Sequence, residues 1–103
     1  MSVGEKLYKI VIHDDAKEML YTHVRFVANV SVAAARKLRD TLYKAIMSLE
    51  TAPYRCPVYQ TRRAAGYYRR LIVGRYQIIY AIKEVESVVS IRYIFDSRQD
   101  NDI

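Results

Sequence analysis

The chain has 103 residues, of which 51% are hydrophobic and 27% are charged. These values are typical of one folded soluble domain over residues 1–103, and they argue against a disordered chain or a second domain. The formal net charge of +6 predicts an anionic partner, such as nucleic acid or an acidic protein segment.

The first elements predicted along the chain are a strand and a helix. Residues 7–12 alternate loosely between polar and apolar side chains and end at a polar HDD, which is typical of a strand leading into a helix cap. Asp15 and Glu18 have the spacing of a capping box, and Asp14 is the alternative cap. Apolar residues then recur at helical spacing as far as Val27, which predicts a helix of about four turns.

A second helix is predicted to begin after Ser31, which is placed to cap it. Its apolar stripe runs to Leu49, and Pro53 excludes helical continuation because the residue before a proline disfavours helical geometry. The joint NVS between the helices is short, so we expect an antiparallel helical hairpin.

The second half of the chain predicts a loop and an antiparallel meander. Residues 51–66 contain both prolines and show no period, which indicates a loop crossing the sheet edge. Three strands are predicted at residues 67–73, 76–83 and 88–95, joined by turns short enough to force antiparallel pairing, and a polar tail begins at about residue 96. The predicted fold class is α+β: an N-terminal strand, an antiparallel two-helix hairpin and an antiparallel three-stranded meander packed on the helices.

The period of two in a strand sorts the meander into two faces. The apolar set expected to meet the helices is Leu71, Val73, Tyr76, Ile78, Tyr80, Ile82, Val89, Ile91, Tyr93 and Phe95. The other set is Arg70, Ile72, Gln77, Ala81, Lys83, Ser90 and Arg92. An unpaired arginine inside an apolar core is costly, so Arg70 and Arg92 should face water or a partner.

The strongest charge signal is a stretch from Thr51 to Lys83 that contains no Asp or Glu. It predicts a basic surface on one side of the protein. The residues predicted to bind a target or nucleic acid are Arg62, Arg63, Arg69, Arg70, Arg75, Gln77, Arg92 and Arg98. The alternatives are that these arginines only add solubility, and that the strand tyrosines pack the sheet rather than stack on bases.

Three stretches together resemble the RelE/ParE superfamily of toxins from type II toxin–antitoxin modules. They are SVAAARKLRDTLYKAIMSLETAP, YRRLIVGRYQIIYAI and VVSIRYIFDSRQD, and the resemblance extends over essentially the whole chain. It implies a growth-arresting protein that is held inactive, in a hetero-oligomer, by a cognate antitoxin whose C-terminal segment wraps around it. The helices are more similar to the ParE-like branch, which inhibits DNA gyrase, than to the RelE-like branch, which cleaves mRNA on the translating ribosome.

The residues at the RelE-like positions favour the ParE-like interpretation. Arg70 falls where the RelE pattern has a lysine on its catalytic face, and Arg98 falls on its C-terminal arginine. However, Gln77 replaces a second functional arginine, Asp96 replaces a histidine found in several relatives, and the C-terminal tyrosine would lie past Ile103. In a nuclease, Arg70 and Arg98 would hold the phosphate, and Asp96, which is expected on the exposed face of the sheet, or a tyrosine would move the protons.

The antitoxin is expected in a groove between the helical hairpin and the sheet. Val27 and Leu42 would supply apolar contacts, and Arg70 would pair with acidic side chains. A solitary nucleic-acid binder using the same basic face is a further alternative.

The remaining residue types predict neither a cofactor nor a membrane anchor. No group of acids or histidines has metal-ligand spacing, and the 3 glycines form no phosphate-binding pattern. The single Cys56 cannot form an internal disulfide, and no apolar run is long enough to span a bilayer or resembles a secretion signal. We therefore expect a cytoplasmic protein.

Overall fold

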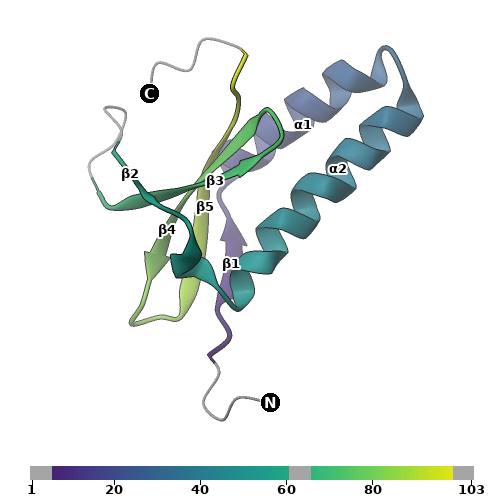
Figure 1. Cartoon of the computed structure of the whole chain (residues 1–103). Helices are drawn as coiled ribbons and strands as arrows, with labels where there is room; N and C mark the ends of the chain where they lie inside the picture. The colour runs from purple at the N-terminus through teal and green to yellow at the C-terminus, as the bar shows by residue number, and fades with distance from the viewer. Residues whose placement is uncertain (1–5, 61–65, 99–103) are drawn as a thin grey trace.

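A computed structural model describes residues 6–60 and 66–98 (Figure 1). The elements in chain order are β1 (Lys9–Ile12), α1 (Asp14–Ala28), α2 (Val32–Met47), the 3-10 helices η1 (Ser48–Glu50) and η2 (Pro53–Arg55), β2 (Val58–Tyr59), β3 (Tyr68–Val73), β4 (Tyr76–Lys83) and β5 (Val88–Asp96). The predicted α+β class, with a helical hairpin followed by an antiparallel meander, is confirmed.

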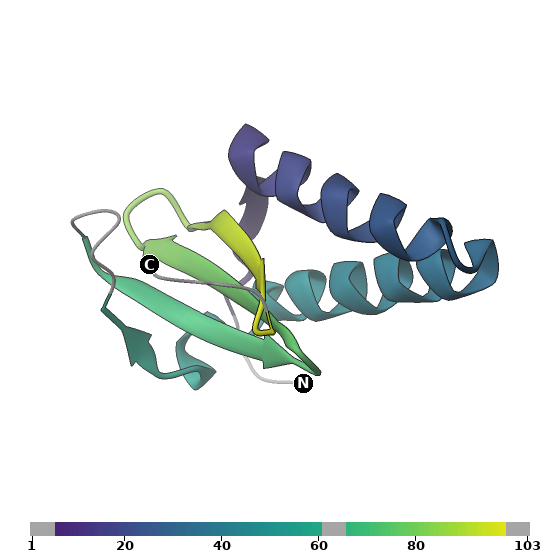
Figure 2. The same cartoon turned by 90° about the horizontal axis from the view of Figure 1, so that it is seen from above.

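The strands form a 5-stranded sheet in the order β1-β5-β4-β3-β2. β1 pairs in parallel with β5, and the other neighbours are antiparallel. The two views show the helical hairpin on one side of this sheet, with its tip extending beyond the strands (Figures 1 and 2). We call the sheet surface opposite the helices the outer face.

Local sequence signals placed the two helices with unequal success. Ser31 caps α2 as predicted, because its Oγ accepts the Ala34 N–H at 3.0 Å. The predicted cap of α1 is wrong: His13 is the N-cap residue, and Asp14 and Asp15 lie in the first turn. The His13 N–H donates to Ile91 O, so strand pairing extends one residue further than the local pattern indicates. The two aspartates still favour the helix, because carboxylates are stabilised near its N-terminus.

The main core lies between the helices and the sheet. Its fully buried residues are Ala16, Leu42, Ile46, Leu49, Ile78, Tyr80, Val89, Ile91 and Ile94. Tyr80 donates its hydroxyl hydrogen to Pro53 O at 2.7 Å, and burial raises the pKa of this tyrosine, so it remains a donor at neutral pH. This contact fixes the loop after α2 against β4.

A β-bulge in β5 overturns part of the predicted division between faces. Tyr80 pairs with Ile91 while Ile79 pairs with Tyr93, so Arg92 is an extra residue in β5. An extra residue reverses the alternation of side chains beyond it. Tyr93 and Phe95, predicted to meet the helices, therefore lie on the outer face.

The outer face carries its own apolar layer, which we call the aromatic layer: Tyr59, Tyr68, Ile79, Ala81, Tyr93 and Phe95. Met19 of α1 also packs against this layer. Ile79 is fully buried although it points away from the helices, and the rings of Tyr93 and Phe95 stack with centroids 5.5 Å apart. Tyr59 belongs to β2, which the sequence placed inside a loop. The outer face is therefore a packed surface as well as a charged one.

A polar cluster around Glu84 joins the segment before β1 to the β4–β5 turn. One carboxylate oxygen of Glu84 accepts from Tyr8 OH at 2.8 Å and from Tyr54 OH at 2.7 Å, and the other pairs with Lys6 Nζ. The contact with Lys6 and the two tyrosine hydrogen bonds lower the pKa of Glu84 to about 2. The cluster thus links three segments that are distant in sequence.

This lowered pKa predicts a pH-dependent contribution to stability. Since the pKa is depressed in the folded state, the contribution is present above the ordinary value of 4.5 and is lost as pH falls toward about 2. Acid unfolding followed by circular dichroism should show a smaller loss of stability over this range in Glu84→Gln than in the unsubstituted chain. Glu86→Gln, an exposed position in the same turn, is the control and should retain the full loss. Equal losses in all three proteins would contradict the prediction.

Candidate functional site

The first candidate surface is a row of polar side chains across the outer face. Arg70 on β3 lies with its guanidinium carbon 4.7 Å from the centroid of the Tyr59 ring, and its Nη1 donates to Gln77 Oε1 at 3.3 Å. Gln77 Nε2 donates in turn to Ser97 Oγ at 3.1 Å. The structure therefore connects Arg70 and Gln77, both predicted target contacts, with the residue that precedes Arg98.

Arg70 also retains unused hydrogen-bonding capacity. Its Nε is buried and has no hydrogen-bond partner among the described residues. A buried polar group without a partner is costly, so a rotation of the guanidinium that brings Nε to an acceptor on a bound group would be favoured. The outer-face positions of the described strands include no acidic residue that could neutralise this arginine.

The other predicted basic residues occupy different surroundings. The Arg92 guanidinium lies 5.8 Å from the centroid of the Tyr93 ring. Arg69 points to the opposite face from Arg70, where its Nη1 donates to the backbone oxygens of Tyr54, at 3.3 Å, and Cys56. It therefore holds the loop containing η2 against β3. Arg62 and Arg63 lie outside the described residues.

Asp96 lies on the helix-facing side of the sheet, so the expectation that it lies on the exposed face is wrong. The β5 bulge places it opposite Tyr76, and its side chain is only 8% exposed. Arg75 Nε lies 3.6 Å from Asp96 Oδ2, and Oδ1 accepts the Arg98 N–H at 2.9 Å, with Arg98 Nε 3.8 Å away. The carboxylate of Asp96 is thus engaged by two arginines.

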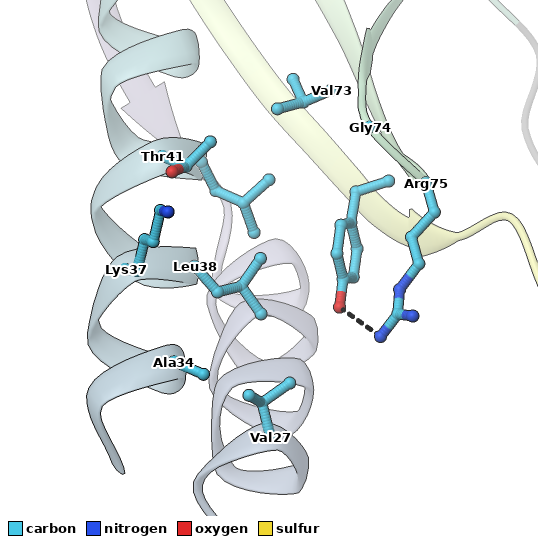
Figure 3. Close-up of a pocket in the computed structure, with 10 residues that line it drawn as sticks. Val27, Ala34, Lys37, Leu38, Thr41, Val73, Gly74 and Arg75 are labelled. Carbon is cyan, nitrogen blue, oxygen red and sulfur yellow. Dashed lines mark hydrogen bonds between the residues drawn. The ribbon is translucent and has the colours of Figure 1, made fainter. Parts of the chain in front are cut away.

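The second candidate surface is a groove of about 400 Å³ between the tip of the helical hairpin and the β3–β4 turn (Figure 3). We call it the tip groove. It is lined by Val27, Ala34, Lys37, Leu38, Thr41, Leu42, Val73, Gly74, Arg75 and Tyr76. Two of the predicted antitoxin contacts, Val27 and Leu42, line it, whereas Arg70 lies on the outer face.

The tip groove has apolar walls and a cationic rim. Lys37 on α2 and Arg75 on the turn are its charged lining residues, and both are positive. Arg75 Nη2 donates to Tyr76 OH at 3.4 Å, and this contact, followed by the charge of Asp96, raises the pKa of the guanidinium. Gly74 has φ 59°, a conformation that glycine adopts without strain and that the two-residue turn requires.

A smaller cleft of about 250 Å³ lies between α1 and the end of β5. It is lined by Glu18, Met19, Thr22, His23, Ile94, Phe95 and Asp96. His23 Nε2 donates to Ile94 O at 2.8 Å, and its ring meets the Tyr76 ring edge-on at 5.2 Å between centroids. Tyr76 and Arg75, which line the tip groove, contact His23 and Asp96, which line this cleft.

Sequence reasoning missed most of the tip groove. Ala34, Lys37 and Thr41 border the apolar stripe of α2, and this spacing of three and four residues is the signal that could have located the wall. The contribution of Val73 and Tyr76 depends on where the β3–β4 turn lies relative to the helices, for which the sequence contains no local signal.

The described residues contain no group of three or more His, Cys, Asp or Glu side chains arranged to hold a metal ion. None of the helices within residues 6–60 and 66–98 is long and apolar enough to cross a membrane.

The chain is similar to known proteins in sequence family and in fold. The family model described as "ParE toxin of type II toxin-antitoxin system, parDE" matches residues 10–101. No curated protein matches the sequence significantly. One similar structure is the toxin–antitoxin complex RelBE2 from Mycobacterium tuberculosis, with 17% identity, a TM-score of 0.62 and coverage of 88% of this chain and 92% of the matched chain. Another is the archaeal RelE–RelB complex from Pyrococcus horikoshii OT3, with 14% identity, a TM-score of 0.53 and coverage of 91% and 99%.

Proposed function

Because the chain belongs to the ParE toxin family of type II toxin–antitoxin systems, we propose that it arrests growth by binding a cellular target protein through its outer face, with DNA gyrase as the leading candidate. As a toxin of such a system it has an antitoxin as its partner. Both similar structures are toxin–antitoxin complexes, which supports such a partner for this chain.

The observation that carries the proposed binding role is the outer-face row of Arg70, Gln77 and Ser97 beside the aromatic layer. Arginine and tyrosine are the residue types most enriched in the energetic centres of protein interfaces. Asp96, the residue considered for proton transfer, is engaged by Arg75 and Arg98 on the helix-facing side. This arrangement favours binding over RNA cleavage.

The tip groove fits the antitoxin. Its apolar walls suit one face of an amphipathic segment, and the cations Lys37 and Arg75 suit acidic side chains on the edge of that segment. The contacts proposed for the antitoxin are therefore those of Val27 and the two rim cations. Leu42 is fully buried behind the groove lining and offers no exposed surface for a direct contact. Because the groove and the outer face lie on different sides of the sheet, the antitoxin need not cover the target-binding residues in order to neutralise the toxin.

A RelE-like mRNA endonuclease is the second candidate, and one observation favours it. The buried Nε of Arg70, without a partner among the described residues, could donate to a phosphate oxygen, and Ser97 next to Arg98 lies one hydrogen-bonded step beyond Gln77. In this role Arg70 and Arg98 would stabilise charge developing on phosphorus, and a tyrosine of the outer face would move the proton.

The proposal is tested by expressing the chain from an inducible promoter. The expression is carried out with and without the protein encoded by the adjacent reading frame. We expect growth arrest that is relieved by co-expression, together with loss of negative plasmid supercoiling. Primer extension on a translated message separates the candidates: cuts within codons and unchanged supercoiling would favour the nuclease. Normal growth at full soluble expression would contradict both functions.

A further inference from the structure

Arg75 belongs to the tip groove and also contacts Asp96 and Ser97 at the end of β5. Its side chain lines the tip groove (Figure 3) and is 37% exposed. The Nε of Arg75 lies 3.6 Å from Asp96 Oδ2. Asp96 itself is only 8% exposed. A molecule in the groove can therefore reach the guanidinium of Arg75 but not the carboxylate behind it.

Asp96 in turn holds the segment that follows β5. Its Oδ1 accepts the Arg98 N–H at 2.9 Å, and the Ser97 N–H donates to Arg75 O at 2.6 Å. Ser97 Oγ accepts from Gln77, which accepts from Arg70. A connected set of hydrogen bonds and ion pairs thus links Arg75 at the groove rim with Arg70 on the outer face.

We propose that the Arg75–Asp96 pair couples the tip groove to the outer face, because an acidic side chain bound in the groove competes with Asp96 for Arg75 and thereby loosens Ser97 and Arg98. This inference rests on the proposed function, in which an acidic antitoxin segment fills the groove. It adds a mechanism by which the antitoxin alters the target-binding surface without covering it.

The geometry determines the direction of the coupling. A partly exposed ion pair at 3.6 Å is weak, whereas a carboxylate that reaches a guanidinium with two parallel hydrogen bonds forms a stronger contact. The incoming acid therefore displaces Asp96 from Arg75. The Asp96 carboxylate then loses the contact that orients its Oδ2, so the hydrogen bond from the Arg98 N–H to its Oδ1 weakens. Coupling between sites is reciprocal in free energy, so a ligand that orders Ser97 and Arg98 with Asp96 should weaken binding in the groove.

The decisive experiment measures the affinity of the purified chain for the antitoxin encoded by the adjacent reading frame. Asp96→Asn, which keeps the shape and removes the charge, should release Arg75 and tighten binding about two- to fivefold. In an Arg75→Gln background the same substitution should have no effect. Lys37→Gln is the matched control, because it removes the other rim cation: it should weaken binding, and Asp96→Asn should still tighten binding in that background.

A second measurement needs no partner. In ¹H–¹⁵N spectra of the free chain, Arg75→Gln should shift the amides of Ser97 and Arg98 and speed hydrogen exchange at Arg98, whereas Lys37→Gln should leave both unchanged. An Asp96→Asn effect of equal size with and without Arg75, or an unaltered Arg98 amide in Arg75→Gln, would overturn the coupling. Failure of the unsubstituted chain to bind the antitoxin would instead count against the proposed function, and the free-chain spectra would still test the coupling.

Discussion

Replacing Leu42 with alanine should lower the free energy of unfolding by about 2–5 kcal/mol, because the substitution removes methyl groups from a side chain that is fully buried. Leu42 lies on α2 and belongs to the core cluster formed with Ala16, Ile78 and Tyr80. The helices and the sheet are separate layers, so a cavity between them cannot close without moving a whole element. Urea unfolding followed by circular dichroism measures the effect.

Leu7→Ala is the matched control, since Leu7 is 67% exposed and precedes β1. The same substitution at this position should change the free energy of unfolding by no more than about 0.5 kcal/mol. A similar loss in both variants, or a loss below about 1 kcal/mol in Leu42→Ala, would show that the interface between α2 and the sheet is not tightly packed.

The second large effect is expected from Arg70→Ala, which should weaken target binding by about 2 kcal/mol or more, or roughly 30-fold. The substitution removes the contact with the Tyr59 ring, the hydrogen bond to Gln77 and the unused Nε donor. The affinity for purified gyrase and the inducer concentration needed for growth arrest measure the loss. Arg70→Lys should recover little of it, because an ammonium group cannot reproduce the planar set of donors.

Arg39→Ala provides the control for net charge. Arg39 lies on α2 and pairs with Asp40, and both side chains are more than half exposed. Its removal lowers the net charge by the same amount as Arg70→Ala, yet it leaves the outer face intact. Equal losses of growth arrest in the two variants would indicate that overall charge, and not the outer face, carries the toxicity.

The elements most accurately predicted are those whose signals are local. α2 follows from an apolar stripe with a serine at its start, and β4 follows from a run rich in isoleucine and tyrosine after a glycine turn. Both depend on interactions between residues a few positions apart. The cap of α1 and the short strand β2 were not recognised, because each is defined by backbone pairing with distant segments, at Ile91 and at Tyr68–Arg69 respectively.

The candidate site shows the same division. The basic stretch without acidic residues marked the outer-face arginine Arg70 and the groove-rim arginine Arg75, because charge distribution can be read directly from composition. Their different roles could not be read in this way. Arg69, Arg70 and Arg75 lie close together in the sequence, yet their contacts differ. Arg69 donates to loop carbonyls, Arg70 contacts the Tyr59 ring, and Arg75 lines the tip groove.

Amino-acid pattern alone was therefore sufficient for the fold class, the helical hairpin, the meander and the excess of positive charge, since these properties depend on periodicity and short-range chemistry. The extra residue Arg92 in β5 was decided by pairing with β4, and it moved Asp96 to the helix-facing side, beside Arg75. The tip groove likewise exists only because the hairpin packs against the β3–β4 turn. A strand register and the packing of two layers depend on contacts between residues far apart in the chain, which no local period records.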